Sequence, residues 1–204
     1  MKYISSSSEF GQQLLNRFIK YVKIWTESDS SIADAGTIPS TKRQFDFANL
    51  LKEELISLGL ANVQVTENCY VYALLPSTKP ENATSSICLL AHMDTSEEVS
   101  GKDVNPLLHK NYDGKILHLN SDISINPQND SYLAKTANTS DTIITSDGST
   151  LLGADNKAGI AEIVTALEYL CNHKEIQHWA IEVVWSPDKE TGRGMDKVPM
   201  DVIK

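Results

Sequence analysis

Short apolar strands alternate with amphipathic helices along this chain, and the alternation restricts it to an α/β fold. The runs Ile87–Ala91 and Ala180–Trp185 are almost continuously apolar, as expected of strands that are buried on both faces of a sheet. Val63–Thr66 and Tyr70–Leu75 are rich in β-branched and aromatic residues, which predicts a hairpin or two adjacent strands. Together with the helices, these strands predict a three-layer α/β arrangement.

Three segments have the apolar spacing of amphipathic helices. Phe10–Trp25 carries apolar residues every three or four positions, which predicts a helix that packs on a flat surface. A second helix carries Phe47, Leu51 and Leu55 and should end at Gly59. A third should follow Asp155; its apolar positions are Ile160, Ile163, Val164, Leu167 and Leu170.

Other stretches lack this periodicity. Residues 97–141 contain many Asn, Asp and Ser side chains, so we expect a long excursion over the surface with short strands of its own. Residues 76–86 are mostly polar and are expected to form a loop. Ile143–Ser149 predicts a hairpin that closes at Asp147 and Gly148.

Composition excludes several classes of protein. The 204 residues are 41% hydrophobic, enough for a sizeable core, and carry a net charge of -9, which disfavours nucleic acids and acidic membranes as partners. The serine run in residues 1–9 lacks the basic and apolar segments of a leader sequence, so we expect none, and no apolar stretch approaches the ~18 residues of a membrane span. Three widely spaced cysteines, expected to be buried thiols, point to a reducing cytoplasm; they are Cys69, Cys88 and Cys171.

Polar residues follow three of the predicted strands. His92 and Asp94 come after the first, Asp155 after the second, and Asp188 with Glu190 after the third. Ligands gather at the carboxyl ends of strands in open α/β sheets, so these side chains can share one site. Imidazole and carboxylate groups hold zinc, manganese or cobalt in hydrolytic sites, which makes a metal hydrolase the leading candidate.

Each cluster also has a simpler structural explanation. A His-x-Asp sequence at a strand end is typical of a turn or a helix cap. Asp155 and Asn156 suit a helix N-terminus, and residues 187–190 suit a charged turn. Their equivalent places in successive strand units favour the shared site, and pattern alone leaves both interpretations open.

Three longer strings resemble the peptidase T family, the tripeptide aminopeptidase branch of the di-zinc aminoacylase and carboxypeptidase family. They are AHMDTSEEVSGKDVNP (Ala91–Pro106), TSDGSTLLGADNKAGIAEI (Thr145–Ile163) and SPDKETGRG (Ser186–Gly194). The opening helix and the loop Ile38–Thr41 also fit, so the resemblance covers nearly the whole chain from about Phe10. It implies the mixed-sheet catalytic domain of the zinc exopeptidases.

The resemblance assigns a role to each matching residue. It implies that His92 ligates one zinc ion, that Asp155 bridges two, and that Glu190 ligates the second. Asp94 would orient His92 from behind. The other histidines have no such match and are expected at the surface; they are His109, His118, His173 and His178.

Two substitutions depart from the family pattern. Lys189 stands where the family has its general-base glutamate, and an ammonium group cannot accept a proton at neutral pH unless its pKa falls by several units. We therefore expect activity to be about 10²- to 10⁴-fold lower than with a base in place. Asn156 replaces an aspartate that is usual in the family but ligates nothing, so we expect a smaller effect.

The chain stops at Lys204, about halfway through a family member. We therefore expect residues 1–204 to form the N-terminal part of the catalytic domain, with no second domain, without the lid and dimerisation domain and without the remaining metal ligands. Each ion would then keep two protein ligands instead of the usual three, so we expect weak or partial zinc binding. Missing strands would leave a sheet edge open, and we expect self-association there.

Two hypotheses follow from the sequence. The first is a zinc-dependent aminopeptidase that removes the N-terminal residue of small peptides, above all tripeptides, and is impaired or inactive in this form. The second is a non-catalytic remnant that folds and binds a metal ion or a partner chain. Lys189 and the short length motivate the second.

Overall fold

The computed structural model describes residues 8–79, 85–137, 139 and 141–203. The N-terminal serines up to residue 7 and residues 80–84 of the expected polar loop lie outside the described part. The helices are α1 (Glu9–Val22), α2 (Ser30–Asp34), α3 (Gln44–Ser57), α4 (Ser131–Lys135) and α5 (Ala154–Asn172). The strands are β1 (Ala61–Val65), β2 (Val71–Leu75), β3 (Ser86–His92), β4 (Pro106–His109), β5 (Leu117–His118), β6 (Ser124–Ile125), β7 (Ile143–Ser146) and β8 (Ala180–Ser186).

The main sheet has four strands in the order β1-β2-β8-β3. β1 and β2 form the expected antiparallel hairpin, and β2 pairs antiparallel with β8. β3 runs parallel to β8, with His92 opposite Ser186. The mixed sheet predicted from the sequence is therefore confirmed, and its parallel pair brings two strand ends together.

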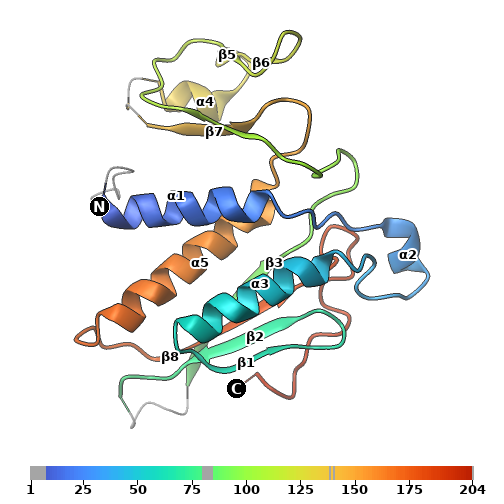
Figure 1. Ribbon diagram of the computed structural model, residues 1–204, viewed down its shortest axis with the longest axis vertical. Coiled ribbons are helices and arrows are strands. Elements are labelled where there is room, and N and C mark those ends of the chain that lie inside the picture. The colour runs from blue at the N-terminus through green and yellow to red at the C-terminus, as the bar shows by residue number, and fades with distance from the viewer. Residues whose placement is uncertain (1–7, 80–84, 138, 140, 204) are drawn as a thin grey trace.

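Helices α3 and α5 pack on one face of this sheet, and α1 packs on α5 (Figure 1). Successive side chains of a strand point to opposite faces of the sheet. Every second residue therefore meets the helices, as Val71, Ala73, Val183 and Trp185 do. The predicted helices at α1, α3 and α5 are confirmed, and α3 is followed by Gly59 at φ +83°. No helix in the described part of the chain is long and apolar enough to cross a membrane.

The opposite face of the sheet carries a smaller apolar cluster. Tyr70, Tyr72 and Val184 lie there, and the segment that follows β8 covers them with Val198 and Val202. No helix of the described residues contributes to this cluster. The chain thus supplies one helical layer, the sheet and a thin cover on the far side.

Residues 106–146 form a separate small lobe beyond α1 (Figure 1). Within it β4 pairs with β7, β5 pairs with β6, and Tyr112, Leu117 and Leu133 make a core of their own. The expected surface excursion with short strands is therefore confirmed. The hairpin expected at 143–149 is wrong, because β7 takes β4 as its antiparallel partner instead of folding back at Asp147 and Gly148.

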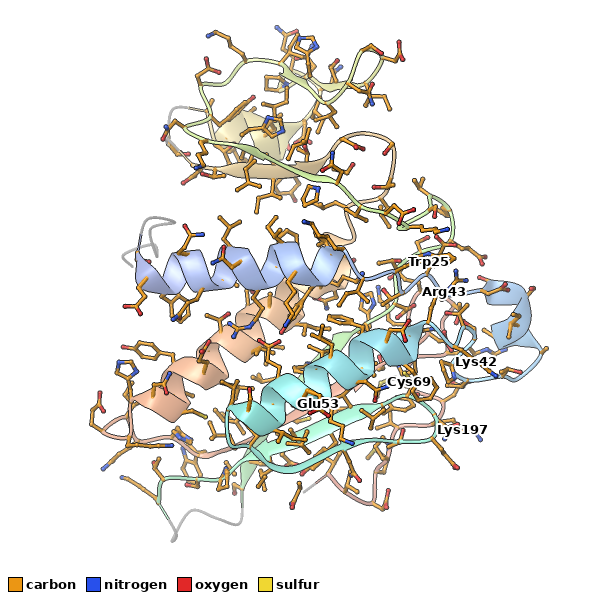
Figure 2. The ribbon with its side chains drawn as sticks, in the orientation of Figure 1. Trp25, Lys42, Arg43, Glu53, Cys69 and Lys197 are labelled. Carbon is orange, nitrogen blue, oxygen red and sulfur yellow. The ribbon has the colours of Figure 1, made fainter. Side chains whose placement is uncertain are left out.

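Three further expectations need correction. Trp25 lies beyond the end of α1, where the Arg43 guanidinium stacks 3.8 Å from the centre of its ring (Figure 2). α1 packs on α5, a helix and not a flat sheet. β3 is not buried on both faces: it lies at the edge of the sheet, where Ile87 and Leu90 are 54% and 55% exposed.

Arg17 ties the three covering helices together. Its guanidinium donates hydrogen bonds to Glu54 of α3 at 2.8 Å, and to Thr165 and Glu168 of α5 at 2.6 and 2.8 Å. Tyr21 adds a hydrogen bond to the second oxygen of Glu54. The planar guanidinium can serve several acceptors at once, so one side chain fixes the angles between helices.

Replacing Arg17 with alanine should lower the free energy of unfolding by about 3 kcal/mol, because Glu54 and Glu168 would lose their buried partner. Urea denaturation measures the change. Lys20→Ala is the matched control: Lys20 lies 3.7 Å from the same Glu54 but is exposed, and its loss should cost less than about 1 kcal/mol. Equal losses in the two variants would contradict the role given to Arg17.

Candidate metal centre

The side chains predicted to form a site converge at the carboxyl ends of β3 and β8. His92 is the last residue of β3, and Glu190 belongs to the turn that follows β8. Asp155 lies at the start of α5, after Gly153 turns the chain at φ +77°. Because β3 and β8 run parallel, their carboxyl ends lie side by side. The first residues of α5 lie next to these strand ends.

His92, Asp155 and Glu190 form one group of potential metal ligands. Their ligand atoms all lie within 4.8 Å of one another. The His92 Nε2 atom is 2.9 Å from Asp155 Oδ1 and 3.7 Å from Glu190 Oε1. Two ligand atoms around a tetrahedral zinc ion lie roughly 3.3 Å apart, so these distances fit a metal ion with little adjustment.

The His92 ring has an oxygen neighbour at each nitrogen. Nδ1 lies 3.1 Å from the Asp94 carbonyl oxygen and 3.2 Å from its carboxylate, while Nε2 faces Asp155. Burial by itself lowers the pKa of His92, but the hydrogen bonds with Asp94 and Asp155 outweigh it and raise the pKa above its usual value. Without a metal ion, both ring nitrogens of His92 must carry a proton to donate hydrogen bonds to these oxygens. A bound metal ion would replace the proton on Nε2.

Asp94 is fully buried and connects the two strand ends. Besides facing His92, its carboxylate accepts backbone N–H bonds from Lys189 at 3.0 Å and from Glu190 at 2.9 Å. One side chain therefore orients the imidazole and positions the backbone that carries Glu190. The sequence did not reveal these contacts to the backbone after β8.

Asp188 holds the same turn from its other side. Its buried carboxylate accepts hydrogen bonds from the Ser40 N–H and hydroxyl, both at 2.6 Å, and from the Gln44 amide at 2.7 Å. Ser40 and Gln44 are supporting residues that the sequence analysis missed, because they precede Asp188 by over 140 positions. Asp188 does not belong to the ligand group found among the described residues, and it anchors the backbone just before Glu190.

The helix start around Asp155 has an unusual backbone. The peptide bond between Asp155 and Asn156 is cis. Gly159 lies so close to the Asn156 side chain that a Cβ atom there would be 2.2 Å from Oδ1. Asn156 thus packs against its own helix, whereas the Asp155 side chain is 78% exposed and open toward a ligand.

Lys157 is a buried lysine that the sequence analysis also missed. Its ammonium donates to the carbonyl of Ile24, just after α1, and lies 5.6 Å from the ring of Phe47. Burial lowers the pKa of Lys157 to about 7, against an opposing effect of the Asp94 charge. The hydrogen bond between Lys157 and Ile24 joins the beginning of α5 to the segment just before Thr26. The carbonyl oxygen of Thr26 accepts a hydrogen bond from the N–H of Thr95.

Lys189 points a half-exposed side chain at the ligand group. Its ammonium is 2.8 Å from Glu190 Oε1, the same oxygen that faces His92. The hydrogen bond to Glu190 raises the pKa of Lys189 above that of a free lysine. The ammonium therefore stays protonated at neutral pH and competes with a metal ion for Glu190.

Of the five histidines, His92 alone belongs to this group among the described residues. His109 contacts Thr145 in the small lobe, and His173 stacks on Tyr169 at the end of α5. The structure places His118 and His178 outside the group as well, as expected. All three cysteines are free thiols; Cys69 is buried, and Cys88 and Cys171 are partly exposed, so the expectation of buried thiols holds for the first alone.

Comparison with known proteins reveals extensive similarity. The chain is 47% identical over 197 residues to peptidase T of Alkaliphilus oremlandii, covering 93% of this chain and 46% of that one. It is 45% identical over 186 residues to peptidase T of Bacillus subtilis, covering 91% and 44%. The chain therefore spans less than half the length of these curated relatives. No protein-family model matches it.

Solved structures show the same fold. Aminopeptidase PepT from Bacillus cereus superposes with a TM-score of 0.64 at 23% identity, over 94% of this chain and 40% of that one. A tripeptidase from Staphylococcus aureus gives 0.63 at 25% identity, over 95% and 41%. Both matches leave over half of the solved chain without a counterpart here.

The anchoring role of Asp188 predicts a specific loss of stability. In Asp188→Asn an amide NH₂ would face a hydrogen-bond donor, so we expect the free energy of unfolding to fall by about 2–3 kcal/mol in urea denaturation. Asp196→Asn, an exposed change in the same segment, is the control and should stay within about 0.5 kcal/mol of the parent. If Asp188→Asn matched this control, the carboxylate would not be the anchor.

Proposed function

This chain is homologous to the peptidase T proteins over nine-tenths of its own length and under half of theirs, and from that premise we propose that it is the metal-binding part of a tripeptide aminopeptidase. The observation that carries the proposal is the convergence of His92, Asp155 and Glu190 on one point, with Asp94 behind them. Zinc is the metal we propose, because one imidazole and two carboxylates suit it.

His92, Asp155 and Glu190 would hold the metal, with the exposed Asp155 shared between two ions. Zinc, when bound, supplies the Lewis acidity that polarises the first carbonyl of a small peptide. Asp94 keeps the His92 ring in one orientation and holds the Glu190 backbone against it. The substrate class, a tripeptide with a free N-terminus, rests on the relatives and is part of the proposal.

Hydrolysis also requires a group that accepts a proton from the attacking water, and Lys189 occupies the position we assign to it. Its pKa is raised and its ammonium donates a hydrogen bond to Glu190, so the protonated nitrogen has no lone pair to offer at neutral pH. We therefore propose that peptide hydrolysis is impaired while the ligand group is retained.

A non-catalytic protein is the second candidate. The observation that favours it is the ion pair between Lys189 and Glu190, which places a positive charge against one of the metal ligands. In this alternative the chain keeps its fold and still binds a metal ion, but it no longer catalyses peptide hydrolysis. Activity measurements on position 189 separate the two candidates.

Changing Lys189 to glutamate should restore proton transfer. The variant is made in a chimera in which this chain is joined to the part of Bacillus subtilis peptidase T that lies beyond the matched region. We expect kcat/KM for zinc-dependent tripeptide hydrolysis to rise by about 10²- to 10⁴-fold over the same chimera with Lys189.

Lys102→Glu is the charge-matched control, because Lys102 is exposed and lies outside the ligand group. It should leave kcat/KM unchanged. Equal rates for the Lys189→Glu and parent chimeras would refute the assignment of position 189, and the absence of hydrolysis in both would favour the non-catalytic candidate.

Asp94→Asn should weaken zinc binding by about 10- to 100-fold, because an amide cannot accept all the hydrogen bonds that orient His92 and Glu190. Competition with a chromophoric chelator measures the affinity without any enzymatic assay. Asp113→Asn, an exposed change in the small lobe, serves as the control. Unchanged affinity in Asp94→Asn would show that the group does not bind zinc as proposed.

A further inference from the structure

Lys157 is a fully buried lysine in the first turn of α5. It is 1% exposed, and besides the ring of Phe47 at 5.6 Å the described residues give its ammonium one hydrogen bond, to the Ile24 carbonyl, and no ion pair. A buried ammonium with so few partners costs more free energy than an apolar side chain of similar size. The stability of the fold therefore does not explain a lysine at this position, and its role lies in what the hydrogen bond holds.

The hydrogen bond ties α5 to a segment that lies beside the end of β3. Segment 24–28 follows α1 and runs parallel to the residues just after β3, where Glu27 and Thr95 form a bridge. The N–H of Thr95 donates to the Thr26 carbonyl at 3.3 Å, and the N–H of Ser28 donates to the Thr95 carbonyl at 3.0 Å. The Ser28 hydroxyl donates to the same carbonyl at 3.2 Å. Segment 24–28 is therefore fastened to α5 at one end and to the residues after β3 at the other.

Candidate metal ligands lie next to both ends of this connection. On α5, Asp155 is two residues before Lys157, and on the other side His92 is three residues before Thr95. The His92 Nε2 atom lies 2.9 Å from Asp155 Oδ1, and the described residues give the Asp155 side chain no other hydrogen bond. Because this side chain is 78% exposed, the backbone of the first turn of α5 sets its place opposite His92.

The turn that leads into α5 packs directly against both ends of the connection. A Cβ atom at Gly153 would lie 3.1 Å from Thr95 Cγ2 and 3.9 Å from Lys157 Nζ. Closely packed groups cannot move independently of one another. A displaced Lys157 side chain would therefore shift the start of α5 relative to the end of β3.

We propose that Lys157 is a positioning residue of the candidate metal centre: by holding segment 24–28, it fixes the separation between Asp155 on α5 and His92 on β3. It does for Asp155 what Asp94 does for His92 and Glu190. A metal site binds well only when its ligand atoms are held to within about 0.5 Å of the required geometry. The inference rests on the metal centre of the proposed function, but the position of Asp155 is measurable without metal.

The first test is Lys157→Met, which keeps the length of the side chain and removes the donor. We expect the Kd for zinc to rise by about 10- to 100-fold in competition with a chromophoric chelator. The midpoint of urea denaturation of the metal-free variant should stay at the parent value, because the lost hydrogen bond is offset by the removal of a buried ammonium.

Leu167→Ala is the matched control, because Leu167 is equally buried on the same helix and lies outside the ligand group. The cavity it creates should lower the urea midpoint and leave the zinc affinity of the folded chain unchanged. A residue that serves only the fold would behave like this control. A positioning residue shows the opposite pattern.

The second test needs no metal. In a crystal structure of metal-free Lys157→Met, the distance between His92 Nε2 and Asp155 Oδ1 should exceed that of the parent by about 1 Å. In hydrogen–deuterium exchange, the Thr95 and Ser28 amides should exchange on the order of 10-fold faster, while the Leu119 amide in the small lobe keeps its rate. A parent chain that binds no zinc would count against the proposed function, and these two measurements would still decide the role of Lys157.

Two results would overturn the proposal. The first is a Lys157→Met variant that lowers the urea midpoint and retains the zinc affinity of the parent. The second is a metal-free variant with the parent distance between His92 and Asp155 and the parent exchange rate at Thr95. Ser28→Ala, which removes the hydroxyl contact at the far end of segment 24–28, replaces Lys157→Met if that variant does not fold. It should weaken zinc binding by about 3-fold and speed exchange at Thr95, and parent values of both would refute the connection.

Discussion

The carboxylate of Asp94 is the contact on which the site depends. It lies at the end of β3, fully buried, and accepts from the backbone of Lys189 and Glu190 after β8 while it faces the His92 ring. A buried carboxylate is stable only when such donors surround it. The strand ends, the imidazole and the turn are therefore held in one arrangement, and Asp188 secures the turn from behind through Ser40.

Two further side chains hold the helices around the site in place. Arg17 fixes the angles between α1, α3 and α5, and Lys157 joins the start of α5 to the segment after α1. Both are basic side chains buried among helices, where their hydrogen bonds fix how the neighbouring elements lie. Asp155 is held at the beginning of a well-anchored helix and still presents an exposed carboxylate.

Lys189 and β3 are two unusual features of the described residues. The lysine brings a protonated group to the candidate ligand set, and β3 exposes Ile87 and Leu90, whereas the apolar residues of β2 are buried. The first feature concerns the candidate site and the second concerns the edge of the sheet. They are independent, because the side chain of Lys189 is directed at Glu190 and the free edge lies along Ile87–Leu90.

Local sequence determined the helices α1, α3 and α5 and the hairpin β1–β2, because periodicity is a property of neighbouring residues. It also placed the candidate ligands His92, Asp155 and Glu190 after strands, and the resemblance to peptidase T singled them out. Tertiary structure alone decided that β7 pairs with β4, that β3 is an edge and that Ser40 and Gln44 support Asp188. These contacts join residues 34 to 148 positions apart, and no local pattern specifies which distant segment will pair with a strand or donate to a buried carboxylate.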